Sequence, residues 1–249
     1  MANDGRAHVL AIGGLGGSLA PPGRGVPRLV GYALELSGRD EPRVCLMNTA
    51  MGDDPRGLAR QYSLLAATRA RVTHLELFPM PNVADPAELL LSQDVIFVGG
   101  GSVANMAAVW RVHELDRILR AAWQAGVVLA GVSAGAICWF QGGTTDSFGT
   151  DLRPFTAGLG FLAGSFCPHY NSEEQRRPLF QSLVAGGALP AGLACDDGAA
   201  VHFAGDTLAE VVADRPGACG YRVEPAAAAG EAAEQVLPTR VLPRPGAAG

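Results

Sequence analysis

The sequence predicts a single α/β domain whose central, mostly parallel sheet is flanked by helices. Short apolar runs that end in glycine-rich or polar turns alternate with longer segments of helical period, which is the pattern of successive β–α units. The composition agrees, because 48% hydrophobic against 17% charged residues in a chain of 249 supply a large core and exclude disorder. No shift in composition marks a boundary, so we expect one domain over residues 7–243 and a frayed tail over 244–249.

Five apolar runs predict the strands of the sheet, and each leads into a loop or a helix. They are residues 8–12, 43–48, 73–78, 94–98 and 127–130. Three segments between them have the spacing of amphipathic helices, namely 58–70, 86–91 and 103–125, and Gly126 ends the last of these. Beyond residue 143 the pattern loosens into shorter strands and loops, and the alanine-rich stretch 224–235 is interpreted as a turn or loop.

The charged residues exclude several classes of function. All 19 basic residues are Arg and none is Lys, so a Schiff-base lysine, a P-loop lysine and a Ser-Lys dyad are absent. The net charge of -5 gives no general attraction for a polyanion, and we expect no nucleic-acid partner. Five widely spaced cysteines without a CxxC pair predict neither zinc nor a redox couple. With no membrane span or leader segment in the pattern, we expect a cytoplasmic protein.

The strongest local signal is the GxSxG motif Gly131-Val132-Ser133-Ala134-Gly135, because an apolar strand precedes it and a helix follows it. A serine on such a tight turn is exposed at the carboxyl end of the sheet. The backbone N–H of Ala134, at the start of the helix, then points towards a developing oxyanion. The motif therefore predicts Ser133 as a nucleophile.

A serine nucleophile needs a base, and His169 is the best candidate among the five histidines. It lies in Cys167-Pro168-His169-Tyr170-Asn171, where proline keeps the backbone extended. Three others are expected to be surface or packing residues: His8, His74 and His113. His202, in a predicted strand, is the second choice.

The acid that orients the histidine is expected at Asp196 or Asp197, whose side chains point apart in a strand or turn. With Asp197 the order along the chain is serine, histidine, acid. That order differs from the nucleophile, acid, histidine order of α/β-hydrolases and disfavours a lipase or an esterase.

Three ordered motifs resemble the peptidase E and cyanophycinase-like serine peptidases, whose fold is related to the class I glutamine amidotransferase domain. Residues 98–101 (VGGG) resemble the family's strand-to-GGG loop, 131–135 its nucleophile turn, and 167–170 (CPHY) its proline-histidine-aromatic motif. The resemblance runs from about Val9 to Val223. It differs after the GGG loop, where peptidase E continues with Asn-Thr and this chain has Ser102-Val103, so contacts of that loop with substrate are expected to differ.

The resemblance implies a role for each matching position. Ser133 is the nucleophile, His169 the general base and then acid, and Gly100 with Ala134 the backbone oxyanion hole. Asp197, before Gly198, matches the third member of the triad. The resemblance also implies a class I amidotransferase-like fold and no metal or organic cofactor.

The resemblance further suggests the substrate, a small peptide and above all a dipeptide with an N-terminal aspartate. Asp146 matches an acid that shapes the site or meets a substrate amine. Arg176 or Arg177 would supply a guanidinium for the aspartate carboxylate, unless both are solvated residues that pair with Glu173 and Glu174. A homodimer is the candidate assembly.

Three alternatives stay open at this point. A cyanophycinase-like or isoaspartyl peptidase would share the catalytic residues and differ in its loops. A non-catalytic amidotransferase-like binding module would have an inert serine, and an esterase would cleave esters but no peptides. The loop Gly13–Ser18 is interpreted as a wall of the active-site crevice rather than a dinucleotide site, because it does not match GxGxxG.

Overall fold

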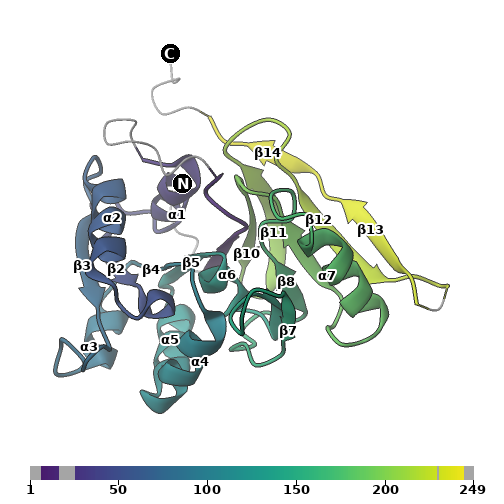
Figure 1. Cartoon of the computed structure of the whole chain (residues 1–249). Coiled ribbons are helices and arrows are strands. Elements are labelled where there is room, and N and C mark those ends of the chain that lie inside the picture. The colour runs from purple at the N-terminus through teal and green to yellow at the C-terminus, as the bar shows by residue number, and fades with distance from the viewer. Residues whose placement is uncertain (1–6, 17–25, 229, 244–249) are drawn as a thin grey trace.

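The structure, a computed structural model, describes residues 7–16, 26–228 and 230–243. Among these residues eight strands form the larger of two sheets (Figure 1). In spatial order they are β14 (Thr239–Val241), β11 (Thr207–Ala213), β10 (Ala199–Ala204), β1 (His8–Ile12), β5 (Val128–Val132), β4 (Val95–Val98), β2 (Arg43–Met47) and β3 (Arg71–Leu75). All neighbours are parallel except at the two sides of β10. The predicted α/β fold with a mostly parallel central sheet is confirmed.

A second, six-stranded sheet stands beside the first within the described part of the chain. Its order is β13 (Ala232–Val236), β12 (Gly220–Pro225), β9 (Gly192–Cys195), β8 (Ser165–Cys167), β6 (Gly142–Thr145) and β7 (Arg153–Phe155). Helix α7 (Arg176–Ala185) packs on it through a small apolar cluster that includes Phe180 and Val184. This sheet was not predicted, because its strands are short and the sequence carries no long apolar run there.

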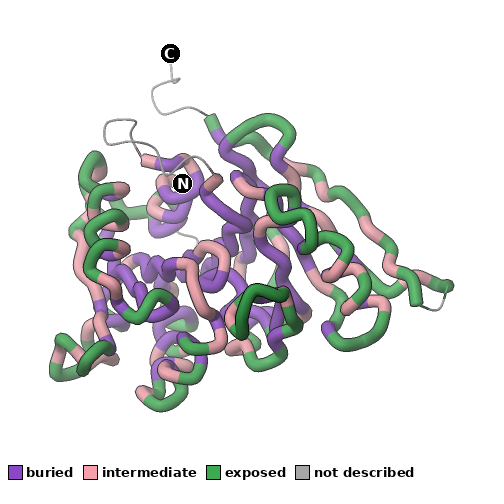
Figure 2. Tube along the Cα trace, in the orientation of Figure 1, coloured by how far each residue is buried: buried purple, intermediate pink, exposed green. Residues whose placement is uncertain are grey.

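Helices cover both faces of the large sheet, and the alternation of side chains along its strands explains how. Leu10 and Ile12 face one cluster, which contains α1 (Arg28–Leu36) and α2 (Pro55–Leu65). Val9 and Ala11 face the other cluster, which contains α3 (Pro86–Leu91), α4 (Val103–Val112) and α5 (Leu115–Gln124). Both faces of these strands are therefore buried (Figure 2), as expected for parallel strands between two helical layers.

Residues 103–125, predicted as one helix, form the two helices α4 and α5. Glu114 breaks the run with a left-handed backbone at φ 55°. The apolar pattern explains why the helix breaks here. Trp110 and Leu115 are five residues apart, so a continuous helix would turn Leu115 away from the face that buries Trp110. The break allows both side chains to be fully buried.

Further elements differ from the prediction, among them β3, which covers Arg71–Leu75 rather than 73–78. Helix α2 covers Pro55–Leu65 rather than 58–70, because the Asp54 side chain accepts a hydrogen bond from the N–H of Arg56 and Pro55 occupies the first turn. Helix α1 was not predicted, since the residue before it, Pro27, provides no side-chain cap. The stretch 224–235, predicted as a turn or loop, contains the end of β12 and most of β13.

Hydrogen bonding to the neighbouring strand β12, rather than local propensity, makes β13 a strand. Its five residues pair with β12, and Glu234 accepts hydrogen bonds from Tyr170 and Arg177 on neighbouring elements. The predicted tail over 244–249 and the end of the Gly13–Ser18 loop lie outside the described residues. None of the helices seen in the described segments is long and apolar enough to cross a membrane.

The topology brings three chain segments to one place. The carboxyl ends of β1, β5 and β4 meet, because Ile12 is paired with Val132 and Val98 with Gly131. The chain then passes from β9 of the small sheet to β10 of the large sheet through residues 196–198, beside this edge. The site described next lies at this junction of the two sheets.

Candidate active site

Ser133 stands on a tight turn between β5 and the short helix α6 (Ala134–Ile137). Its backbone has φ 55° and ψ -114°, a conformation that a non-glycine residue adopts rarely. The flanking glycines leave room for the turn, since a Cβ on Gly131 would collide with the carbonyl oxygen of Gly135, and one on Gly135 with that of Val98. The GxSxG pattern is thus required by close packing of backbone on backbone.

Ser133, His169 and Asp197 form a continuous line of hydrogen bonds. Nε2 of His169 lies 2.9 Å from Oγ of Ser133, and Nδ1 lies 2.7 Å from Oδ1 of Asp197. An ionised carboxylate only accepts hydrogen bonds, so Nδ1 carries the imidazole proton and Nε2 is left to accept the serine O–H. The side chains of His169 and Asp197 are 23% and 16% exposed, so the line is shielded but reachable from solvent.

Backbone contacts fix the histidine and the aspartate relative to β1. The N–H of His169 donates to the carbonyl of Gly13 at 3.3 Å, and the N–H of Gly198 donates to that of Gly14 at 2.7 Å. The N–H of Asp197 donates to Oδ1 of Asn171 at 2.9 Å. The loop after β1 therefore forms a wall behind the imidazole and its carboxylate.

The neighbouring acids 196 and 197 have opposite environments. The hydrogen bond from His169 is the largest influence on Asp197 and holds its pKa below the ordinary value. Asp196 is 2% exposed, and its Oδ2 accepts hydrogen bonds from the N–H of Cys219 and the hydroxyl of Tyr221. Burial raises the pKa of Asp196. Only Asp197 faces the imidazole.

Gly100 and Ala134 present their backbones to the serine, where an oxyanion hole would lie. A Cβ on Gly100 would be 3.3 Å from Cβ of Ser133 and 3.9 Å from its Oγ. Ala134 follows the serine as the first residue of α6. Among the described residues, the N–H groups of Gly100 and Ala134 have no backbone partner, so both are available to a ligand.

A cavity of about 260 Å³ opens in front of Ser133 and His169. It contains two of the predicted binding residues, Asp146 and Arg176, and also Gly101 and Ser102 of the loop that was expected to contact substrate. Two lining residues were not singled out for the site, Ser147 and Glu173. A signal was available for Ser147, because it follows Asp146.

The charged side chains of this cavity differ in how they are paired: Arg176 is held by Glu173, whereas Asp146 is exposed. The Arg176 side chain is 3% exposed, and its Nε donates to Oε2 of Glu173 at 2.6 Å. Its Nη1 donates to the carbonyl of Thr144 at 2.8 Å. Among the described residues, Nη2 has no hydrogen-bond acceptor. Asp146 is exposed to the cavity. The cavity therefore offers an exposed carboxylate and a firmly held guanidinium within one small volume.

Arg177, the other predicted substrate-binding arginine, lies away from this cavity. Its guanidinium pairs with Glu234 of β13 and lies over the rings of Tyr170 and Tyr221, at 5.4 Å and 5.3 Å from their centres. The pairing of Arg177 with Glu174 considered from the sequence is replaced by this longer-range one. Arg177 ties α7 to the edge of the small sheet.

The remaining histidines lie elsewhere. His202, the second choice for the base, is buried with its Nε2 3.0 Å from Nδ1 of His8, and its Nδ1 is 3.1 Å from the Tyr32 hydroxyl. His74 contacts the hydroxyl of Tyr62 at 2.7 Å, and His113 ends α4.

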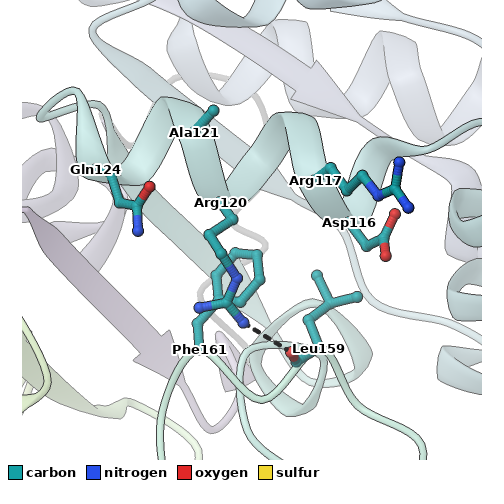
Figure 3. A pocket seen from close by; sticks show the side chains of 7 residues that line it. All are labelled: Asp116, Arg117, Arg120, Ala121, Gln124, Leu159 and Phe161. Carbon is teal, nitrogen blue, oxygen red and sulfur yellow. Dashed lines mark hydrogen bonds between the residues drawn. The ribbon is translucent and has the colours of Figure 1, made fainter.

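A second cavity, of about 210 Å³, lies on the outer side of α5 (Figure 3). There the Arg120 guanidinium lies 4.4 Å from the centre of the Phe161 ring and donates to the carbonyl of Leu159 at 3.3 Å. The described residues around it include no serine, cysteine or histidine. Within the described ranges no group of three or more His, Cys, Asp or Glu side chains is arranged to hold a metal ion.

Comparison with known sequences identifies a family model and two relatives. Residues 16–211 match the model of peptidase family S51. The uncharacterized peptidase YgaJ of Bacillus subtilis (strain 168) is 44% identical over 237 residues, which cover 94% of this chain and 99% of that protein. Peptidase E of Shewanella denitrificans is 28% identical over 143 residues, covering 54% of this chain and 60% of that protein.

Two solved structures share the fold. A peptidase from an acI-B1 Actinobacterium superposes with a TM-score of 0.67 over 96% of each chain, at 16% identity. A putative peptidase E protein from Listeria monocytogenes EGD-e superposes with a TM-score of 0.59, covering 84% of this chain and 98% of that chain, at 16% identity. At this identity the superpositions establish the shared fold.

Proposed function

The chain belongs to peptidase family S51 and is a serine-type peptidase, and we propose that it cleaves short peptides with Ser133, His169 and Asp197 as its catalytic residues. The observation that carries the proposal is the line of hydrogen bonds from Ser133 through His169 to Asp197, with distances of 2.9 Å and 2.7 Å. Such a line activates a serine hydroxyl without any further group.

The first half of the reaction forms an acyl-enzyme. Oγ of Ser133 attacks the peptide carbonyl carbon while Nε2 of His169 takes the hydroxyl proton. The N–H groups of Gly100 and Ala134 stabilise the resulting oxyanion, and Asp197 stabilises the imidazolium. When the tetrahedral intermediate collapses, the C–N bond breaks and His169 returns the proton to the leaving amine.

The second half releases the acyl group by the same chemistry. His169 takes a proton from a water molecule, whose oxygen attacks the ester carbonyl. The oxyanion again lies at Gly100 and Ala134, and the proton passes back to Oγ of Ser133 as the ester bond breaks. The products are a free amine and a carboxylic acid, and the enzyme is restored.

The cavity supports a preference for short peptides with an N-terminal aspartate, which makes the enzyme a dipeptidase or an aminopeptidase. A volume of about 260 Å³ suits one residue of a peptide in front of the serine. The exposed carboxylate of Asp146 suits the α-ammonium group of that residue, and the guanidinium of Arg176 suits its side-chain carboxylate. Proteins with a buried N-terminus would not supply the ammonium group.

The state of the cysteines supports a cytoplasmic location for the proposed peptidase. All five are free thiols, and four are buried. Thiols without disulfides are typical of reducing compartments, which supports a peptidase that works in the cytoplasm.

The test combines a covalent probe with a peptide panel. A fluorophosphonate should label the wild-type protein and leave folded Ser133→Ala unlabelled, and Ser133→Ala and His169→Ala should lose peptide turnover. Dipeptides that begin with Asp, Asn, Glu, Arg or isoaspartate should be cleaved fastest when Asp is first, and N-acetylation of the Asp peptide should slow cleavage.

Each outcome separates the candidates. Fastest cleavage of the isoaspartyl or the Arg peptide would replace the Asp preference and keep the serine mechanism. Ester cleavage with no peptide turnover would support an esterase. A folded wild-type protein that resists the fluorophosphonate would support a binding module with an inert serine.

A further inference from the structure

The loop between β11 and β12 wraps around the segment that carries the catalytic acid. The N–H of Asp214 donates to the carbonyl of Gly198 at 2.8 Å. At the other end of the loop, the N–H of Asp196 donates to the carbonyl of Cys219 at 3.0 Å, and the N–H of Cys219 donates to Oδ2 of Asp196 at 2.9 Å. The loop thus holds the residues on both sides of Asp197.

Arg215 extends from this loop onto Asp197 itself. Its Nη2 donates to the backbone carbonyl of Asp197, and its Nη1 donates to Oδ1 of Asp214 at 3.0 Å. The guanidinium occupies the space beside Gly198, where a Cβ would collide with Nη1 and lie 2.7 Å from Cζ of Arg215. Gly198 has φ +85°, so both its conformation and the close approach of Arg215 favour glycine here.

In the described part of the chain, the charged groups that act on Asp197 come from two loops. The loop between β8 and α7 contributes His169, and the loop between β11 and β12 contributes Arg215 and Asp214. The loop after β1 contributes the uncharged Gly14. Asp196 directs its carboxylate to Cys219 and Tyr221.

The electrostatic direction is consistent with this placement. The hydrogen bond from His169 is the largest influence that holds the pKa of Asp197 below its ordinary value, and the positive charge of Arg215 acts in the same direction. The described lining of the catalytic cavity does not include Arg215. Arg215 therefore contacts Asp197 and lies outside the lining of the cavity.

We infer that Arg215 is a positioning residue, which holds Asp197 in the orientation in which its carboxylate accepts from His169. The inference rests on the proposed triad. The backbone bond from Nη2 fixes the peptide plane of Asp197, and the positive charge of Arg215 favours the ionised carboxylate of Asp197.

The test measures the rate of fluorophosphonate labelling of Ser133 as a function of pH, which requires no knowledge of the peptide substrate. For Arg215→Gln we expect a labelling rate about 10-fold lower at its plateau, because Asp197 is then held less firmly towards His169.

Two further variants separate positioning from general structure. Arg215→Lys keeps the charge and loses the planar fork, so we expect a plateau between those of Arg215→Gln and the wild type. Arg240→Gln is the matched control, because Arg240 is exposed to a similar extent, 47% against 45%, and pairs with Glu210 on β11 rather than with the site. It should label with the wild-type rate and pH profile.

The outcomes are distinct. A wild-type plateau and profile for Arg215→Gln, or equal changes in Arg215→Gln and Arg240→Gln, would overturn the role of Arg215 and leave the triad standing. If wild-type protein is not labelled at all, the triad fails and the role of Arg215 with it. If Arg215→Gln does not fold, a folded Arg215→Lys variant with the wild-type plateau would overturn the inference.

Discussion

Gly14 lies so close to Asp197 that a Cβ on Gly14 would overlap Oδ1 of Asp197 and come within 2.7 Å of Nδ1 of His169. The two residues form an isolated bridge between the loop after β1 and the segment after β9. Glycine is therefore needed at position 14 to leave room for the hydrogen bond between His169 and Asp197, and not to form a turn.

Gly14→Ala should reduce kcat/KM by at least about 100-fold, because the methyl group must displace the carboxylate from the imidazole. Gly31→Ala in α1 is the matched control, since a Cβ there meets nothing within 4 Å and alanine is favoured in a helix. Both variants should unfold within a few degrees of the wild type in a thermal scan. Full activity of Gly14→Ala would show that Asp197 is not needed at this position.

Asp197→Asn should lower kcat by about 10³- to 10⁴-fold, because an amide cannot stabilise the imidazolium and can favour the wrong tautomer of His169. Asp196→Asn should keep kcat within a few-fold of the wild type, since the asparagine oxygen can still accept from Cys219 and Tyr221. Steady-state kinetics on the best dipeptide measures both. The reverse ranking would assign the orienting role to Asp196.

Glu173→Gln should strengthen binding of substrates with an acidic first residue. Glu173 pairs with Nε of Arg176, so removing its charge leaves the guanidinium freer to attract a substrate carboxylate. We expect KM for the Asp dipeptide to fall about 3- to 10-fold and KM for an Arg dipeptide to rise. Glu174→Gln, a neighbouring exposed residue outside the cavity lining, should change neither.

His202 should make the fold less stable in mild acid. Burial, with the neighbouring His8 as a smaller influence, lowers the pKa of His202 from 6.5 to about 4. Between these values the unfolded chain binds a proton that the folded protein does not, so the free energy of unfolding decreases as the pH falls from about 6.5 to about 4. The contribution is fully present above about pH 6.5.

Urea unfolding across this range measures the effect. We expect a loss of about 1–3 kcal/mol in the wild type from His202, and a smaller loss in His202→Gln. Equal pH dependence in the two proteins would contradict the assignment of this step to His202.

Local sequence was sufficient to single out Ser133 and His169, which the structure places within hydrogen-bond distance of each other. Ser133 is recognisable because the strand, the sharp turn and the following helix are contiguous in the chain, and the glycines that the turn needs are its neighbours. His169 follows by elimination from five histidines and from the proline before it. Five of the eight described strands of the large sheet, β1 to β5, were predictable for the same reason, since their apolar runs are continuous.

The tertiary structure decided which of two adjacent acids faces His169, which arginine enters the cavity and how the acid is held. The side chains of Asp196 and Asp197 have different surroundings because both residues lie where the chain crosses from β9 of the small sheet to β10 of the large sheet. Arg176 and Arg177 separate because α7 packs on the small sheet, where Glu234 of β13 takes the second arginine. Sequence by itself determined the residues whose neighbours lie next to them in the chain, whereas contacts across the junction of the two sheets depend on long-range strand pairing that no local pattern encodes.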